Sequence, residues 1–310
     1  MNVSETCMLC PRQCGVPRGE GFCHSPAEPL VASVCVHRGE EPPLNPIVNV
    51  FFAGCNLQCI YCQNRQISSL TPDPSPIEAR GVDVLVDRIC RQLPSTSMRG
   101  DGGEAPLLGF VTAAHYAYAV PDIVERLHRR GLYPTVVYNS SGYESVDTLR
   151  SLEGLVDIYL PDLKYMDPTL AAEYSHAPDY PAVALAAIRE MMRQVGAGLK
   201  VDADGTAYRG LLVRHLVLPG HLDNTRSVLD QLSTLNSQFS IPNTLHLSLM
   251  AQYFPPTDDL PAPLDRTLTA DEYSAAVDYA TRLGFCNIWT QELAATDNYR
   301  PDFTRPNPFE

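Results

Sequence analysis

Three closely spaced cysteines form the clearest chemical motif of the chain. Cys55, Cys59 and Cys62 follow the β-rich run Ile47–Phe52 with the spacing C-x3-C-x2-C, and Tyr61 stands inside the motif. Cysteine thiolates hold iron–sulfur clusters, and a [4Fe–4S] cluster usually takes four of them. With three thiolates one iron keeps an open position, as catalytic metal sites do. The spacing therefore predicts a reactive cluster, because zinc would want a fourth ligand that the loop does not offer.

A second group of cysteines crowds the N-terminus. Cys7, Cys10, Cys14 and Cys23 have the spacing C-x2-C-x3-C-x8-C. Four thiolates can hold a structural zinc ion in a closed tetrahedral site. They can equally hold a second iron–sulfur cluster for electron transfer. The spacing predicts a second metal site and leaves zinc and a cluster as alternatives.

The elements that position these motifs alternate between strand and helix after residue 46. Hydrophobic patterns predict strands at 47–52, 107–111, 135–138, 156–160, 211–218 and 245–250, with a last short strand at 285–290. Helices are expected between them at 82–93, 121–131, 181–195, 223–235 and 269–284. Six such units predict an α/β fold with a parallel sheet and outer helices. They are too few for an eight-stranded barrel, so we expect a partial (β/α)6 barrel with its active site at the carboxyl ends of the strands.

This pattern divides the chain into three parts. We expect a Cys-rich, metal-binding N-terminal extension at 1–46, the partial barrel at 47–295 and a C-terminal tail at 296–310. Residues 71–76 contain three prolines and are expected to form a loop. Glu40 and Glu41, which stand before two prolines, are expected to lie in a solvated turn.

The cysteine loop resembles the signature of the radical S-adenosylmethionine (radical SAM) superfamily. The resemblance covers nearly the whole chain and favours the branch of iron–sulfur proteins related to pyruvate formate-lyase activating enzyme. The segments that carry it are 7–14, 37–42, 156–165 and 214–220. It implies a fold of radical SAM type and S-adenosylmethionine bound at the open iron through its amino and carboxylate groups. Reductive cleavage then gives methionine and a 5′-deoxyadenosyl radical, which abstracts hydrogen from the substrate.

Polar side chains at the expected strand ends are candidates for binding this cofactor. With the resemblance in view, the candidate set is Tyr61, Thr112, Asn139, Ser141, Asp162, Lys164, Arg214 and Gln252. Lys164 is one of only two lysines, and its cation is suited to the cofactor carboxylate. Asp162 and Lys164 resemble a pair that activating enzymes use on the cofactor, although an exposed ion pair would look the same. Asn139 and Ser141 are suited to ribose hydroxyls or the methionyl part, but a simple turn uses the same residue types.

Two features near these strand ends leave alternatives open. Arg214 lies within a strand and needs a carboxylate, supplied either by the cofactor or by an Asp or Glu of a neighbouring strand. Radical SAM enzymes often carry Gly-Gly-Glu after the second strand. Here the segment 102–104 precedes that strand and is read as a turn, so Thr112 takes the strand-end position. His115 is either a residue near the substrate or a structural histidine.

Composition excludes several classes of protein. The net charge is −13, from 23 basic and 36 acidic residues, and no basic stripe suggests nucleic-acid binding. No apolar run approaches the roughly 20 residues that span a bilayer. The N-terminus shows no secretory signal, so we expect a cytoplasmic protein whose ten cysteines bind metal instead of forming disulfides.

These observations predict a radical SAM oxidoreductase of activating-enzyme type that acts on a protein or peptide. The resemblance also implies an external electron donor such as flavodoxin or ferredoxin. A small-molecule substrate is the first alternative, and a non-catalytic iron–sulfur or zinc protein is the second. The residues themselves name neither the substrate nor a catalytic residue beyond the cofactor site.

Overall fold

A computed structural model describes residues 6–70, 79–94, 105–238, 244–293 and 300–310. The expected loop at 71–76 and the Gly-Gly-Glu segment at 102–104 lie outside the described residues. None of the described helices is long and apolar enough to cross a membrane.

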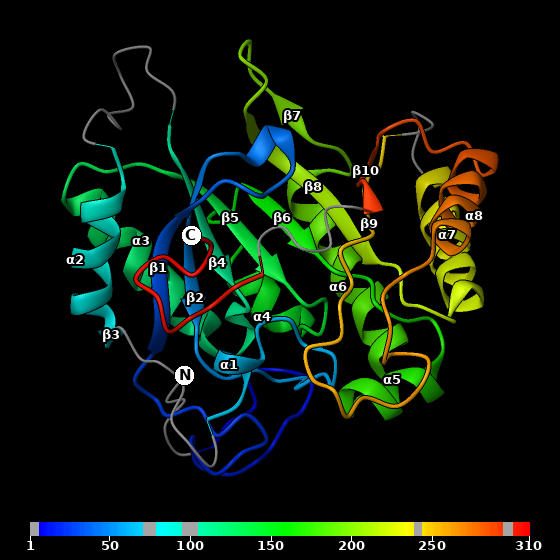
Figure 1. Ribbon diagram of the computed structural model, residues 1–310. Helices are drawn as coiled ribbons and strands as arrows, with labels where there is room; N and C mark the ends of the chain where they lie inside the picture. Colours follow the sequence, from blue (N-terminus) through cyan, green and yellow to red (C-terminus); the bar gives the residue numbers. More distant parts are fainter. Residues whose placement is uncertain (1–5, 71–78, 95–104, 239–243, 294–299) are drawn as a thin grey trace.

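A curved, mostly parallel sheet forms the centre of the molecule (Figure 1). Its strand order is β10-β9-β8-β6-β5-β4-β2-β1-β3, and β2 through β10 along this path are parallel to one another. The parallel strands are β2 (Ile47–Phe52), β4 (Leu107–Val111), β5 (Thr135–Ser140), β6 (Ile158–Pro161), β8 (Ala207–Leu216), β9 (His246–Met250) and β10 (Ile288–Thr290). Six strand–helix units followed by a short strand confirm the expected partial barrel.

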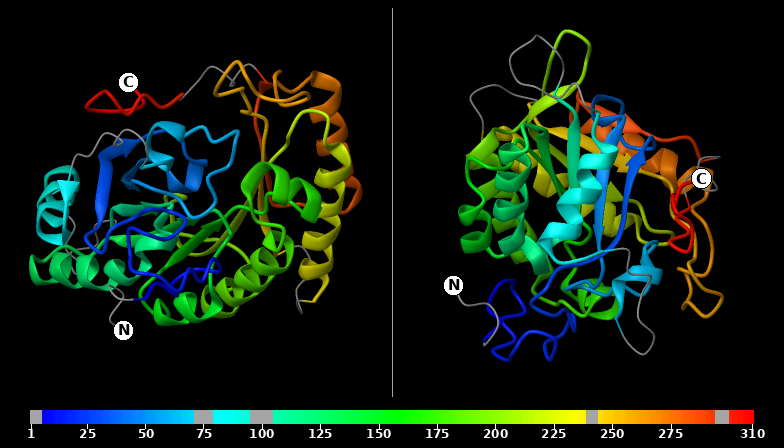
Figure 2. Two further views of the ribbon diagram at one scale, coloured as in Figure 1. Left: turned by 90° about the horizontal axis from the view of Figure 1, so that it is seen from below. Right: turned by 90° about the vertical axis from the view of Figure 1, so that its left-hand side faces the viewer.

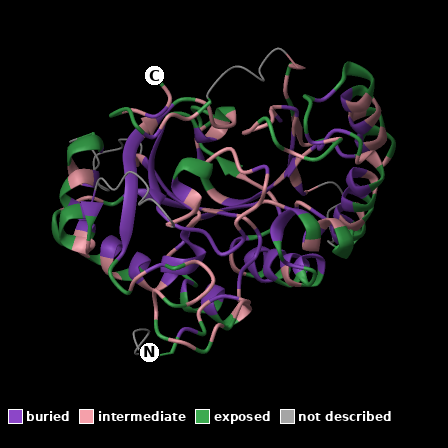
Figure 3. Cartoon of the chain, turned by 60° about the horizontal axis from the view of Figure 1, so that its bottom comes forward, coloured by how far each residue is buried: buried purple, intermediate pink, exposed green. Residues whose placement is uncertain are grey.

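Helices cover the outer, convex side of this sheet (Figure 2). They are α2 (Val82–Gln92), α3 (Val120–Arg129), α4 (Val146–Ser151), α6 (Tyr180–Val195), α7 (Leu222–Ser237) and α8 (Ala270–Arg282). Shorter helices lie in the connections: η1 (Pro42–Leu44), α1 (Arg65–Ser68), η2 (Ala113–Ala119) and α5 (Pro168–Ser175). The strands are almost wholly buried, whereas the helices expose their outer faces (Figure 3).

An antiparallel edge strand was not expected from the sequence. Strand β1 (Leu30–His37) pairs with β2, and β3 (Ala79–Arg80) pairs with β1. A further short strand, β7 (Lys200–Val201), pairs with β8. The segment expected as an N-terminal extension therefore contributes a strand to the sheet, and the part described before β1 lies outside it.

The C-terminal tail packs against the inner face of β1 and β2. Phe303 is buried, and its ring lies 5.3 Å from that of Phe51 between centroids. The Phe309 ring lies 5.6 Å from Phe51 and 4.1 Å from His37. The tail thus covers an apolar face that would otherwise be exposed at this end of the sheet.

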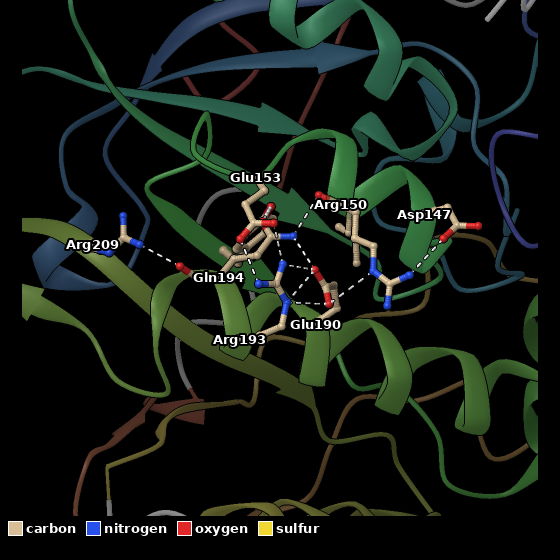
Figure 4. A network of polar contacts seen from close by, with 9 residues as sticks. Asp147, Arg150, Glu153, Glu190, Arg193, Gln194 and Arg209 are labelled. Carbon is tan, nitrogen blue, oxygen red and sulfur yellow. Dashed lines mark hydrogen bonds and ion pairs between the residues drawn. The ribbon is translucent and has the colours of Figure 1, made fainter.

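Ion pairs join two of the outer helices. Arg193 of α6 binds Glu153, which follows α4, and also Glu190 of its own helix (Figure 4). Gln194 donates to Glu190 and to the carbonyl of Leu149. These contacts fix α6 against α4 on the outer side of the sheet.

Candidate functional site

One cavity of about 960 Å³, counting space open to solvent, lies at the carboxyl ends of the parallel strands. Its walls include all three cysteines of the loop after β2. They also include every candidate cofactor-binding residue: Tyr61, Thr112, Asn139, Ser141, Asp162, Lys164, Arg214 and Gln252. Residues spread over nearly 200 positions meet here because parallel strands end at the same edge of the barrel.

The cysteine loop begins with a glycine that no other residue can replace without strain. Gly54 has a φ of 89°, in the left-handed region that disfavours side chains. A Cβ at this position would lie 2.5 Å from Ser25 Oγ and 3.4 Å from His115 Nε2. Its amide donates to the carbonyl of Ile67 at 2.7 Å. The loop is therefore pressed against the N-terminal segment and returns directly into α1.

The three thiols of the loop lie close together in a buried setting. Burial, together with the nearby Cys59 sulfur, raises the pKa of Cys55 to about 11 and that of Cys62 to about 12. Burial also raises the pKa of Cys59, against the opposing influence of Lys164. Ser175 Oγ donates to Cys59 Sγ at 2.9 Å. These sulfurs need a strong positive partner to ionise together, and iron supplies one.

The donor set fits a cluster better than a single ion. In the described part of the chain, no three His, Cys, Asp or Glu side chains are placed to hold one metal ion. A cubane cluster binds each thiolate through a different iron, so its cysteines need not converge on one point. Three neighbouring thiols in one cavity therefore suit the expected [4Fe–4S] cluster.

A buried ion pair faces the same cavity. Lys164 Nζ lies 2.5 Å from Asp162 Oδ2, and both side chains are largely buried. Burial works against the charge of Lys164, but Asp162 and the Cys59 sulfur outweigh it and hold the pKa of Lys164 well above its ordinary value. The backbone amide of Lys164 donates to Tyr180 Oη at 3.0 Å. The site therefore presents a fixed cation next to the cysteine loop, and the pair is not the exposed one considered from the sequence.

Polar groups after β4 and β5 complete this wall. Thr112 has a φ of 55°, which is rare for a β-branched residue, and its amide donates to the carbonyl of Asn139 at 3.0 Å. Ser141 Oγ is buried and has no hydrogen-bond partner among the described residues. A buried hydroxyl without a partner is costly, so this wall is suited to a polar ligand.

Arg214 finds its partners within the chain, in a place that the sequence did not suggest. Its guanidinium binds Glu40 and Glu41, with 2.9 Å between Arg214 Nε and Glu41 Oε1. Both glutamate side chains are only 9% exposed, so the expected solvated turn is wrong. The attraction of the arginine draws these carboxylates inward from the loop after β1 and compensates their burial.

Tyr61 and Gln252 frame two further sides of the cavity. Tyr61 is buried, accepts a hydrogen bond from Tyr165 Oη at 2.5 Å and packs edge-on against Tyr174. The carbonyl of Gln252 accepts a hydrogen bond from Gln63 Nε2 at 2.7 Å. Both residues therefore tie the cysteine loop to other elements in addition to lining the cavity.

A second, larger cavity adjoins the first. Its volume is about 1140 Å³, again counting open space, and Asn64, Asn139, Arg214 and Gln252 line both cavities. Aromatic side chains from β2, β10 and the tail form part of its wall, namely Phe51, Trp289 and Phe309. The two cavities together offer room for a cofactor and a neighbouring substrate.

The four N-terminal cysteines line a separate, narrow pocket of about 350 Å³, most of it space open to solvent or too small for a water molecule. Burial raises the pKa of Cys10 to about 12, and the Cys23 and Cys7 sulfurs add to this effect. Asn56, which the sequence did not mark, lines this cavity from inside the cysteine loop. Arg12 also lines this pocket. Its position between Cys10 and Cys14 is the only feature of the sequence that could have indicated this.

Comparisons with known proteins give two curated relatives. No protein-family model matches the chain. The uncharacterized protein MJ0674 of Methanocaldococcus jannaschii is 25% identical over 292 residues, which cover 91% of this chain and 76% of the relative. The uncharacterized protein MJ0808 of the same organism is 22% identical over 277 residues, covering 84% and 74%.

Three solved structures are distantly similar. A domain of pyruvate-formate lyase-activating enzyme from Bacteroides vulgatus has 14% identity and a TM-score of 0.39, covering 57% of this chain and 93% of that one. QueE from Escherichia coli has 10% identity and a TM-score of 0.42, covering 85% and 94%. Methylornithine synthase has 13% identity and a TM-score of 0.42, covering 76% and 68%. All three TM-scores are below 0.5, and the partial barrel is defined by the strand order of this chain.

Proposed function

We propose that this chain is a radical S-adenosylmethionine enzyme. One observation carries the proposal: the three thiols of the loop after β2 share a cavity with a buried lysine and with the polar groups that end β4, β5 and β6. An electron carrier or a structural zinc site has no need of such a wall beside its metal. The resemblance of the cysteine loop to the radical SAM signature supports the same assignment.

In this proposal Cys55, Cys59 and Cys62 hold three irons of a [4Fe–4S] cluster. Such a cluster, with S-adenosylmethionine at its remaining iron, supplies the electron that yields methionine and a hydrogen-abstracting 5′-deoxyadenosyl radical. Ser175 stabilises the Cys59 thiolate through its hydroxyl hydrogen bond. The buried tyrosines around Tyr61 keep water away from this side of the loop.

The remaining walls would bind the cofactor. Lys164, oriented by Asp162, donates to the carboxylate of S-adenosylmethionine. Ser141 and Asn139 hydrogen-bond its hydroxyl or amino groups, and the unpartnered Ser141 Oγ gains a partner in doing so. Thr112 and Gln252 line the same cavity. Arg214 acts indirectly, because Glu40 and Glu41 already occupy its guanidinium.

We further propose that the substrate is a segment of a protein or peptide, as in activating enzymes. The adjoining cavity of about 1140 Å³ has room for several side chains, and its aromatic wall suits an apolar segment. The net charge of −13 disfavours a nucleic acid, since phosphates would be repelled. A reduced flavodoxin or ferredoxin would supply the electron. Hydrogen transfer only to metabolites, with no protein partner modified, would favour the small-molecule alternative.

The test of the reaction is formation of 5′-deoxyadenosine by anaerobically reconstituted protein with S-adenosylmethionine and reductant. The Cys59→Ala variant should lose the loop cluster, about four irons per chain, and all cleavage activity. Cys286→Ala is the matched control, because this thiol is exposed and remote from both groups of cysteines. Undiminished cleavage by Cys59→Ala would refute the assignment.

A second pair of variants tests the cofactor wall. Lys164→Met should keep the iron but weaken binding of S-adenosylmethionine about tenfold or more, the effect expected for a lost charged hydrogen bond. The other lysine of the chain, Lys200, is exposed on β7, so Lys200→Met should leave binding unchanged. Equal affinities for the two variants would contradict the role of Lys164.

A further inference from the structure

The four N-terminal cysteines form a second built site, separate from the loop after β2. Cys7, Cys10, Cys14 and Cys23 line one cavity, which the main chain closes by hydrogen bonds from the Cys7 amide to the carbonyl of Val16 at 2.9 Å and back from Gly15 to Cys7 at 3.1 Å. The segment packs at the same end of the sheet as α1 (Figure 2). None of these four cysteines lies in a helix or strand.

The groups around these thiols are donors to sulfur. The Phe22 amide donates to Cys14 Sγ at 3.5 Å, Arg18 Nη1 lies 3.8 Å from Cys7 Sγ, and the Asn56 side chain hydrogen-bonds Cys10. Arg12 and Arg18 place two positive charges in the cavity wall. Hydrogen bonds to sulfur and nearby cations stabilise the negative charge of an iron–sulfur cluster and set its potential.

The placement of the thiols favours a cluster over one ion. Zinc requires four sulfurs about 2.3 Å from a common centre. No three described ligand side chains are placed to hold a single ion, although all four thiols line one pocket. His115 adds a second observation: it is 1% exposed, lines this cavity, and its Nδ1 has no hydrogen-bond partner among the described residues. A cluster in the cavity offers that nitrogen a sulfur or an iron as a neighbour.

Direct contacts connect this cavity to the cysteine loop. Asn56 follows Cys55 in the chain, while its fully buried side chain hydrogen-bonds Cys10. Arg12 donates to the carbonyls of Asn56 at 2.8 Å and of Ser175 at 3.1 Å, and Ser175 in turn donates to Cys59 Sγ. Asn56 alone therefore separates the two groups of thiols on the first route, and Arg12 and Ser175 lie between them on the second.

We propose that Cys7, Cys10, Cys14 and Cys23 bind a second iron–sulfur cluster, which passes single electrons through Asn56 to the loop cluster. Cys14 and Cys23 are partly exposed, so an external one-electron donor of the ferredoxin or flavodoxin class can reach this side. The donor loses one electron, the N-terminal cluster gains and then loses it, and the loop cluster gains it; no bond or proton changes place. The metal assignment stands by itself, whereas the relay rests on the proposed function.

The metal assignment is tested in the variant with Cys55, Cys59 and Cys62 all changed to Ala. After anaerobic reconstitution it should keep about four irons and matching sulfide, with an electron paramagnetic resonance signal after reduction by dithionite. Circular dichroism like that of Cys286→Ala verifies the fold. Stoichiometric zinc without sulfide, or no metal in folded protein, overturns the proposal. The readout needs no activity, so it stands even if the proposed reaction fails.

The relay is tested in Asn56→Leu, which keeps all seven cysteines. Iron and sulfide analysis selects preparations that retain both clusters, and dithionite, which reaches both clusters directly, should still reduce both. Reduction of the loop cluster by reduced flavodoxin should slow at least tenfold, as followed by rapid-freeze electron paramagnetic resonance. Gln13→Ala, next to a ligand but on the partly exposed side, is the control. An unchanged rate in Asn56→Leu overturns the relay and leaves the cluster assignment intact.

Discussion

Burying an arginine inside a parallel strand is unfavourable unless carboxylates surround it, and Arg214 has two. Its side chain is 11% exposed, and Glu40 and Glu41 are each 9% exposed. Asn49 also donates to Glu40 at 3.0 Å, so this carboxylate has partners on two sides. The three charges form a fixed unit between the two cavities and join the loop after β1 to β8.

Removing the cation from this unit should destabilise the protein strongly. Arg214→Met leaves two carboxylates buried without a cation, and we expect a loss of about 3 kcal/mol or more in the free energy of unfolding. Urea unfolding of the purified chain measures this. Arg226→Met is the control, since Arg226 and its partner Asp223 are exposed, and it should cost less than about 1 kcal/mol. Equal losses of unfolding free energy in the two variants would show that the buried ion pairs of Arg214 stabilise the protein no more than an exposed pair does.

Glu144 is a second buried carboxyl, placed just beyond β5. It is 2% exposed, accepts a hydrogen bond from Ser140 Oγ at 2.7 Å, and has a second oxygen without a partner among the described residues. Burial raises its pKa to about 7, although Ser140 and Tyr138 partly oppose this. The folded protein therefore keeps a proton on Glu144 at pH values where the unfolded chain has lost it.

This proton gives stability a definite pH dependence. Between about pH 4.5 and pH 7 the folded state binds the extra proton, so the contribution of Glu144 falls as pH rises. Glu144→Gln removes the titration and should flatten the decline by an amount on the order of 3 kcal/mol. Urea unfolding at pH 5 and pH 8 measures the difference. A variant that keeps the slope of the parent protein would exclude Glu144 as its source.

At the scale of elements, α8 shows how a local signal determines a boundary. Thr269 Oγ1 accepts the amide of Glu272 at 3.3 Å, and Glu272 Oε2 accepts the amide of Thr269 at 2.9 Å. The two bonds form a reciprocal capping box at the residue where the sequence predicted the helix to begin. It satisfies two amides that the first turn of a helix would otherwise leave unpaired.

Loss of this cap should therefore have a measurable cost. Thr269→Ala removes the oxygen that accepts the Glu272 amide, and we expect a loss of about 1 kcal/mol in unfolding free energy. Thr281→Ala, on the exposed side near the end of the same helix, is the matched control and should be neutral or slightly stabilising. Thermal unfolding compares the two variants, and a larger loss for Thr281→Ala would contradict the capping argument.

Elements with regular patterns could be predicted, and those set by distant contacts could not. The six parallel strands have continuous apolar runs that sequence reveals directly, which explains why the strand-end residues were found together. Strand β1 was missed because it lies in a Cys- and Pro-rich region and is buried on both faces, by α2 and by the tail, so it lacks alternation. The pairing of Glu40 with Arg214 spans 174 positions, and only the folded chain brings them together.

The whole molecule combines a barrel that has a large hydrophobic core with an N-terminal segment, residues 6–29, that is held by side-chain contacts. The barrel has a large continuous core from β2 to α8, whereas the described residues before β1 contain no helix or strand. That segment is held mainly by Arg12, Arg18 and the Gln58 contact to Phe22. Binding of metal by its four thiols would therefore add a large share of its local stability.

Removal of iron should consequently loosen one end of the molecule and leave the rest intact. If the proposed metal sites are correct, anaerobic chelation should increase amide hydrogen exchange in residues 6–29 and in the loop 53–64, which contain the proposed ligands. Exchange in β4, β5 and β6 should stay slow, because these strands are buried under α3 and α6 and contain none of the seven cysteines proposed as ligands. Mass spectrometry of loaded and chelated protein compares the two states peptide by peptide. Uniform acceleration throughout the barrel would instead mean that metal holds the entire fold together.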